Sequence, residues 1–120
     1  MYNILIVDDA NLMRTMIKNN LSTLGQVTLM EAENGSVAVE KYKQLRPNLV
    51  TMDITMDVKN GVDAAREILQ FDPDARIIMV TALGQKNLLR ECVSMGVQDF
   101  IVKPFARDRL ISAVKKAIAA

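Results

Sequence analysis

Five short hydrophobic runs alternate with five segments of helical periodicity along the chain. The runs hold few internal polar residues, which is typical of parallel strands that helices cover on both faces. They span residues 2–8, 27–32, 48–53, 76–82 and 99–103. Because strands and helices alternate throughout, the pattern predicts an α/β protein in which repeated β–α units form one doubly wound, five-stranded parallel sheet.

The segments between the runs repeat hydrophobic residues every three or four positions, which is the spacing of one helix face. The first predicted helix runs from Leu12 to Leu24, and Gly25 is its expected C-cap. The second ends before Pro47 and the third before residues 72–74, because proline disfavours helix continuation. The fourth covers residues 88–93 and ends at Gly96, and the fifth covers residues 110–118. Strands and helices together predict a (βα)5 arrangement.

The length of 120 residues fits one domain with a proper core, so we expect a single domain over residues 1–120 and no output domain. No hydrophobic run is long enough to cross a bilayer, and the first residues, "MYNILIVDD", lack the features of a secretion signal. These observations predict a cytoplasmic location. A monomer is the simplest expectation for the oligomeric state.

Charge and residue usage narrow the functional classes. Fifteen basic and fourteen acidic residues nearly balance, so we expect no nucleic-acid partner and no membrane partner. Histidine is absent, which excludes histidine metal ligands, histidine general bases and a phosphohistidine carried by this chain. The single cysteine, Cys92, and most of the eight methionines fall within hydrophobic periodicities, so we expect them to fill the core.

Polar residues follow four of the five predicted strands. The first strand ends in Asp8-Asp9, the third in Asp53, the fourth in Thr81-Ala82 and the fifth in Lys103-Pro104. The second strand runs into "EAENG" and adds nothing to this set. Because ligands bind at the carboxyl ends of the strands in open α/β sheets, these side chains are expected to converge.

Each of these residues alone has a simpler explanation. Asp8 or Asp9 could cap the first helix, Asp53 could start a turn, and Thr81 could cap the fourth helix. Together they place three carboxylates, a hydroxyl and an ammonium group at one edge of the sheet. Clustered carboxylates repel one another unless a cation is present, and oxygen ligands suit Mg²⁺. The set is suited to phosphoryl chemistry, in which a carboxylate can act as the nucleophile.

Five motifs in this order and spacing resemble the receiver domain of two-component response regulators, over essentially the whole chain. They are "VDD", "MDI", Asn60-Gly61, "VTA" and "DFIVKPF". In particular, the chain resembles single-domain receivers of the chemotaxis type. The resemblance implies a flavodoxin-like fold with the strand order 2-1-3-4-5.

The resemblance also assigns a phosphoacceptor and a metal site. Asp53 would accept the phosphoryl group. Asp9 and Asp53 would contact Mg²⁺ directly, Asp8 would act mainly through water, and the backbone carbonyl of Thr55 would be a further ligand.

Other positions would bind the phosphoryl group and report its presence. Thr81 and Lys103 would hold the phosphoryl group, with the backbone amide of Ala82. Phe100 would turn inward when Thr81 moves toward the phosphoryl group, and the Lys103–Pro104 peptide bond would be cis. The face formed by the fourth helix, fifth strand and fifth helix would then bind a downstream protein.

The function that the resemblance implies is a phosphorylation-activated switch and not a conventional enzyme. A histidine kinase would supply the phosphoryl group, and a partner such as the flagellar motor switch would receive the signal. Alternatives are a phosphorelay intermediate and a receiver that docks constitutively. A small-molecule phosphatase of the haloacid-dehalogenase type is disfavoured because the aspartate spacing disagrees with D-x-D-x-T. A flavin-binding domain is disfavoured because the phosphate-binding glycine motifs are absent.

The chain departs from the usual receiver pattern near the site. Asp57 stands where proline is usual, and Lys59 where an apolar residue is usual. We interpret both as solvated loop residues that could pair with each other. Phe100 replaces the more common tyrosine and so lacks a hydroxyl group. Leu83 lies where bulk could hinder the water that removes the phosphoryl group.

Overall fold

The computed structural model describes residues 2–56, 58–82 and 86–119, and its strands form one parallel sheet. The order across the sheet is β2-β1-β3-β4-β5, as the receiver resemblance implied. The strands are β1 (Tyr2–Val7), β2 (Val27–Ala32), β3 (Leu49–Met52), β4 (Ile77–Thr81) and β5 (Asp99–Val102). β3 pairs with β1 on one side and with β4 on the other, so β3 is the central strand of the sheet.

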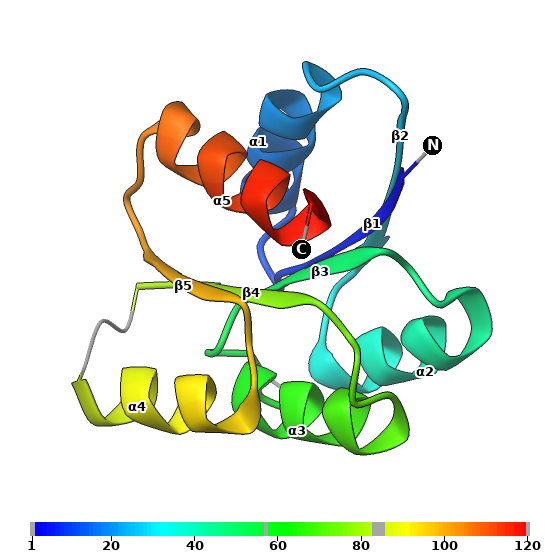
Figure 1. Ribbon diagram of the computed structural model, residues 1–120, viewed down its shortest axis with the longest axis vertical. Helices are drawn as coiled ribbons and strands as arrows, with labels where there is room; N and C mark the ends of the chain where they lie inside the picture. The colour runs from blue at the N-terminus through cyan, green and yellow to red at the C-terminus, as the bar shows by residue number, and fades with distance from the viewer. Residues whose placement is uncertain (1, 57, 83–85, 120) are drawn as a thin grey trace.

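Five helices cover the two faces of the sheet. They are α1 (Asn11–Ser22), α2 (Gly35–Leu45), α3 (Gly61–Phe71), α4 (Lys86–Met95) and α5 (Arg107–Ala119). Figure 1 shows α1 and α5 on one face and α2, α3 and α4 on the other. The predicted (βα)5 arrangement is therefore confirmed for the described residues. None of the described helices is long and apolar enough to cross a membrane.

Alternate residues of each strand enter two separate hydrophobic cores. Ile4 and Ile6 pack toward α1 and α5, whereas Leu5 and Val7 pack toward α2, α3 and α4. Successive side chains of a strand point to opposite faces, so a sheet covered on both faces has nearly continuous hydrophobic strands. The expectation for Cys92 is confirmed, because its side chain is fully buried in the second of these cores.

Some predicted boundaries were wrong by a few residues. β1, β3, β4 and β5 each end one residue early. The residues that lie just outside the strands are therefore Asp8, Asp53, Ala82 and Lys103. The predicted C-cap at Gly25 was also wrong, because α1 ends at Ser22 and Thr23 is its C-cap. The Ser22 and Thr23 hydroxyls donate to backbone carbonyls one turn back, and such local bonds compete with helix continuation. Gly25 instead occupies a left-handed turn with φ of 64°.

Candidate functional site

Three carboxylates meet at the carboxyl edge of the sheet, where β1 and β3 end. One carboxylate oxygen from each of Asp8, Asp9 and Asp53 lies within 4.8 Å of the others. The backbone amide of Asp53 donates to Val7 at 3.0 Å, and this bond aligns the two chain segments after their strands end. The parallel pairing of β1 with β3 therefore brings together residues that are far apart in the sequence.

Asp8 is almost fully buried, and both of its carboxylate oxygens have partners. Oδ1 accepts a hydrogen bond from the backbone amide of Ala10 at 2.9 Å. Oδ2 accepts one from Nζ of Lys103 at 2.7 Å. A buried carboxylate is stable only when it is paired and hydrogen-bonded, and Asp8 meets both conditions. Asp9, in contrast, is exposed at the mouth of the site.

Asp53 is buried, with 6% of its surface exposed, and it is less well compensated than Asp8. Its Oδ1 accepts from the backbone amide of Ile54 at 2.9 Å and lies 3.7 Å from Nζ of Lys103. Burial raises the pKa of Asp53, and the charges of Asp8 and Asp9 raise it further, while Lys103 opposes the shift. The metal-free site therefore resists holding all three carboxylates ionised.

Lys103 is positioned by the backbone on both sides of it. Its amide donates to the carbonyl of Thr81 at 2.8 Å, which extends the pairing of β4 and β5 by one residue. The Lys103–Pro104 peptide bond is cis, which is the geometry that the resemblance implied. The side chain is 16% exposed and reaches across the sheet edge to Asp8 and Asp53.

Gly61 allows the start of α3 to approach the backbone of Asp53. A Cβ atom at position 61 would lie 1.8 Å from the Asp53 carbonyl oxygen, so no side chain fits there. The amide of Gly61 donates to Ile54 at 2.8 Å. Asn60 caps α3 by accepting from the amide of Asp63 at 2.9 Å. The Asn60-Gly61 motif thus fixes the loop that follows Asp53.

The remaining predicted site residues lie around the three carboxylates and Lys103. Thr81 ends β4 and is buried, whereas the next residue, Ala82, is exposed. Thr55, two residues after Asp53, is also exposed. Phe100 is 9% exposed and belongs to the core that contains Cys92. The sheet edge therefore brings together the carboxylates, Thr81 and Lys103, while Phe100 lies beneath the face that includes α4.

The capping roles considered for Asp8, Asp9 and Thr81 are wrong. The N-cap of α1 is Ala10, so neither Asp8 nor Asp9 caps this helix. α4 begins at Lys86, so Thr81 does not cap it.

The loop residues that depart from the usual receiver pattern are Asp57, Lys59 and Leu83. Lys59 pairs with Glu67 of α3, so its pairing with Asp57 is not needed to explain its position. Asp57 and Leu83 lie outside the described residues.

One contact at the site was not predicted. Arg14 of α1 donates to the backbone carbonyl of Asp8 at 2.6 Å and to Glu31 of β2 at 2.9 Å. Glu31 is the first residue of "EAENG", the segment that we had expected to contribute nothing. In a single sequence Arg14 looks like a solvent-facing residue of an amphipathic helix, so no signal distinguishes it.

The donor set fits a divalent cation. Three carboxylates within 4.8 Å of one another supply hard oxygen ligands, and the exposure of Asp9 leaves room for water molecules. Mg²⁺ prefers oxygen ligands and retains several waters in protein sites. Lys103 neutralises one of the three negative charges of the carboxylates, and a divalent ion would neutralise the other two.

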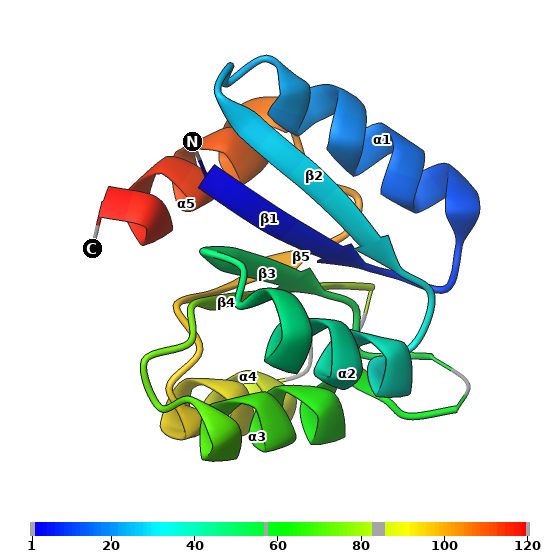
Figure 2. The ribbon, with the colours of Figure 1, turned by 90° about the vertical axis from the view of Figure 1, so that its right-hand side faces the viewer.

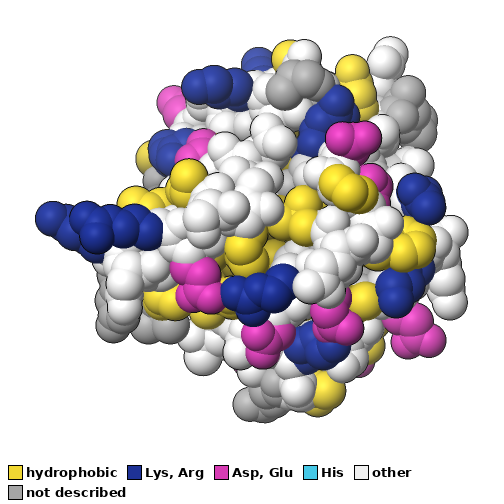
Figure 3. Space-filling model, turned by 60° about the horizontal axis from the view of Figure 1, so that its bottom comes forward, with side chains coloured by type: hydrophobic (Ala, Val, Ile, Leu, Met, Phe, Trp, Pro, Cys, Tyr) yellow, Lys and Arg dark blue, Asp and Glu magenta, His cyan; other side chains and the backbone are white. Residues whose placement is uncertain are grey.

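On the face at the bottom of Figure 1, basic and acidic side chains are mixed around hydrophobic ones (Figure 3). Arg66, for example, pairs with Asp63 on its own helix and with Glu91 on α4. A nucleic-acid site requires a concentrated positive field. This face has no such field among the residues that the structure describes.

The fold and the acidic edge define a receiver domain. Residues 4–115 match the family described as "Response regulator receiver domain", and the chain belongs to that family of two-component signalling domains. It is 51% identical to the chemotaxis protein CheY of Bacillus subtilis over 117 residues, covering 98% of both chains. It is 50% identical to CheY of Thermotoga maritima over 113 residues, covering 94% of both chains.

A solved structure of a related protein supports the fold. The structure of the CheX–CheY–BeF3–Mg²⁺ complex from Borrelia burgdorferi matches with a TM-score of 0.90 and 34% identity. The match covers 96% of this chain and 87% of that chain.

Proposed function

We propose that the protein is a phosphorylation-activated switch in which Asp53 accepts a phosphoryl group from a histidine kinase. The observation that carries this proposal is the buried Asp53 carboxylate, which lies beside two further carboxylates and 3.7 Å from the ammonium group of Lys103. That arrangement occurs in a chain of the receiver family. A structural ion pair would not require three carboxylates and a single lysine at one edge.

In the proposed reaction, an oxygen of Asp53 attacks phosphorus and the bond from phosphorus to the leaving nitrogen breaks. The electron pair stays with the departing imidazole, and the product is an acyl phosphate. Asp53 must be ionised to attack, and Lys103 favours that form while burial opposes it. Mg²⁺, when bound by Asp8, Asp9, Asp53 and the carbonyl of Thr55, would neutralise charge on the phosphoryl oxygens.

Lys103 has a second role in this proposal. Its Nζ lies nearer to Asp8 than to Asp53, at 2.7 Å and 3.7 Å. A phosphoryl group on Asp53 would offer Lys103 a new anionic partner, and the hydroxyl of Thr81 with the amide of Ala82 would complete the contacts. Thr81 would then move toward the phosphoryl group, and the buried Phe100 would stabilise the conformation that follows.

The signal would leave through the face formed by α4, β5 and α5. Leu89 and Val93 on α4 and Val102 on β5 are exposed hydrophobic residues on these elements, which suits them to protein contact. Because the two CheY relatives described above are chemotaxis proteins, we propose chemotaxis as the pathway and the flagellar motor switch as the partner. We further expect a cytoplasmic monomer with no nucleic-acid or membrane partner.

The phosphoacceptor is tested with a small phosphodonor and Mg²⁺. Intact-mass measurement should show one added phosphoryl group on the unaltered protein and none on Asp53→Asn. Asp74→Asn is the matched control, because Asp74 is an exposed aspartate on the turn after α3, far from the carboxyl edge. Equal labelling of Asp53→Asn would refute the assignment.

The output is tested by partner capture with and without a beryllofluoride mimic of the phosphoryl group. Binding of a motor-switch protein that requires the mimic would support the chemotaxis role. Transfer of the phosphoryl group onward to a histidine-containing domain would instead indicate a phosphorelay intermediate. Binding that ignores the mimic would indicate constitutive docking.

A further inference from the structure

Arg14 links the acidic loop to the edge strand of the sheet. Its side chain is 13% exposed, and it donates to the loop after β1, to β2 and to Asn11 of its own helix. Nη1 donates to the backbone carbonyl of Asp8 at 2.6 Å, and Nε donates to the carboxylate of Glu31 at 2.9 Å. Figure 2 shows α1 lying beside β2. The two hydrogen bonds place the Arg14 side chain between Asp8, which follows β1, and Glu31.

Glu31 holds the Arg14 side chain from the strand side, and we call it the anchor of this arginine. It lies one residue before the end of β2, paired in register with Ile6 of β1. Its second carboxylate oxygen accepts from Nζ of Lys18 at 3.0 Å. The hydrogen bonds from Lys18 and Arg14 lower the pKa of Glu31, so the carboxylate stays ionised at neutral pH. The guanidinium group is therefore held in place from the strand side.

The bond to Asp8 acts on the peptide group between Asp8 and Asp9. The Asp8 side chain is already held by Ala10 and Lys103. Asp9 is exposed, so its position depends mainly on the direction of the backbone that carries it. A donor on the Asp8 carbonyl fixes the orientation of that peptide group, and with it the direction in which Asp9 leaves the loop.

We propose that Arg14 is a positioning residue that sets the cation affinity of the acidic site, with Glu31 as its anchor. This inference rests on the proposed function, because it concerns the same Mg²⁺ site. Groups behind the ligands of a metal site orient them, and their loss typically weakens metal binding. The second strand thus contributes to the site through Glu31 and Arg14, although no side chain of β2 is among the three carboxylates.

A purely electrostatic role for Arg14 makes the opposite prediction. A positive charge near the carboxylates repels Mg²⁺, so its removal would tighten binding, and lysine at this position would change nothing. Positioning requires the planar fork of arginine, which can reach a carbonyl and a carboxylate together. Arg14→Gln and Arg14→Lys therefore separate the two roles by the direction of the effect.

The experiment is a calorimetric Mg²⁺ titration of the full chain. Arg14→Gln and Arg14→Lys should each weaken Mg²⁺ binding by about tenfold. Lys18→Gln is the matched control. It removes a positive charge that pairs with the same carboxylate, Glu31, but it leaves the hydrogen bond from Arg14 to Asp8. It should change the dissociation constant by less than about twofold. Metal-free melting temperatures, from circular dichroism, identify a temperature at which every variant is folded.

Several outcomes would overturn the inference. Unchanged or tighter Mg²⁺ binding in both Arg14 variants would reduce Arg14 to a structural or electrostatic role. A lower metal-free melting temperature with an unchanged dissociation constant would do the same. If Arg14→Gln does not fold, Arg14→Lys and Glu31→Gln carry the test, and both should weaken binding. Absence of Mg²⁺ binding by the unaltered protein is a distinct result, since it would refute the proposed metal site itself.

Discussion

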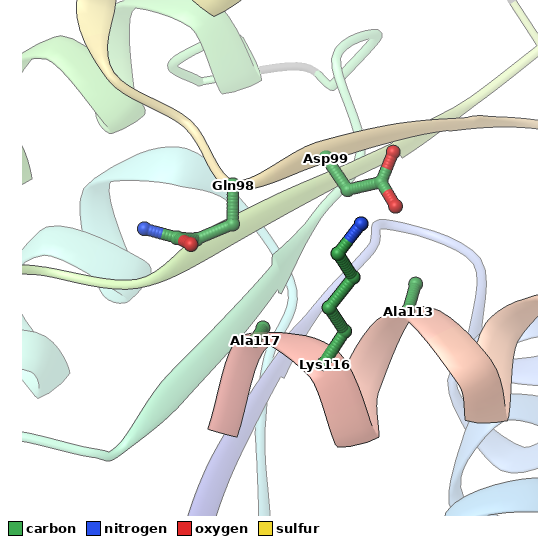
Figure 4. Close-up of a pocket in the computed structure, with 5 residues that line it drawn as sticks. All are labelled: Gln98, Asp99, Ala113, Lys116 and Ala117. Atoms are coloured by element: carbon green, nitrogen blue, oxygen red, sulfur yellow. The ribbon is translucent and has the colours of Figure 1, made fainter. Parts of the chain in front are cut away.

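Two aspartate–cation pairs at β5 show how burial changes the consequence of the same chemistry. Lys103, which follows the strand, pairs with Asp8 at 2.7 Å, and the exposed fractions of the side chains are 16% and 2%. Arg109 of α5 pairs with Asp99, which begins the strand, at 3.1 Å, with exposed fractions of 46% and 31%. Figure 4 shows the side chain of Lys116 extending from α5 toward Asp99 as well, beside a pocket of about 210 Å³.

The difference appears in the neighbouring pKa values. At the buried end, burial and two further carboxylates raise the pKa of Asp53 despite Lys103. At the exposed end, burial alone would raise the pKa of Asp99, but hydrogen bonds from Arg109 and from the amide of Phe100 outweigh it and lower the pKa. The three carboxylates near Lys103 carry more negative charge than this lysine can neutralise without a bound metal ion. The second region is fully compensated and serves to attach α5 to the sheet.

The largest expected contrast comes from removing each cation. Lys103→Met should destabilise the metal-free protein by about 3 kcal/mol, because it leaves Asp8 buried and without its cation. Arg109→Met should cost less than about 1 kcal/mol, because its pair is half exposed. Urea denaturation in the presence of a chelator measures both. Equal losses would show that burial does not separate the two pairs.

Mg²⁺ should stabilise the protein through the buried region only. At about a hundred times its dissociation constant, Mg²⁺ should add about 2.7 kcal/mol to the free energy of unfolding. Asp9→Ala should abolish most of this gain, whereas Asp99→Ala should retain it. Melting curves with and without Mg²⁺ give the answer. A gain that survives in Asp9→Ala would contradict the role of Asp9 as a direct ligand.

Asp53→Asn should stabilise the metal-free protein, by on the order of 1 kcal/mol. The pKa of Asp53 is raised in the folded state, so ionisation at neutral pH costs stability. That cost is absent below the unfolded pKa of about 3.9 and complete above the folded pKa. The advantage of the variant should therefore grow as the pH rises through this interval. A pH series of thermal melts with chelator tests the sign, and a lower melting temperature at neutral pH would contradict it.

The smallest effect should come from the pair of Asp99 and Arg109. Because the folded pKa of Asp99 is lowered, its stabilisation is present above the unfolded pKa and is lost as the pH falls through the folded pKa. Arg109→Gln should flatten this acid dependence by less than about 1 kcal/mol, and salt should weaken it in the parent protein. An acid dependence of equal steepness in the variant would show that other carboxylates cause it.

Much of the fold could be predicted because the sheet is covered on both faces. Continuous hydrophobic strands and periodic helices are visible in the sequence, and the strand order followed from the family resemblance. The ends of the elements were less predictable. α1 ends at Ser22 because the hydroxyls of Ser22 and Thr23 bond to the backbone, a competition that hydrophobic periodicity does not register.

For the site, the sequence indicated the residues but not their pairing. The convergence of Asp8, Asp9 and Asp53 follows from where parallel strands end. The nearer approach of Lys103 to Asp8 than to Asp53 depends on side-chain geometry across 95 positions of sequence. Arg14 and Glu31 were missed for a similar reason, since a contact between a helix and an edge strand leaves no local pattern.

Cys92 gives α4 a built-in chemical probe. It is the only cysteine in the chain, and its side chain is fully buried in the core that also contains Phe100. A thiol reagent can reach it only when α4 separates from the sheet, so the labelling rate measures how often that separation occurs. Burial also raises the pKa of the Cys92 thiol, which keeps it unreactive in the closed state. The opening rate of α4 can therefore be measured on the unmodified protein, without an introduced label.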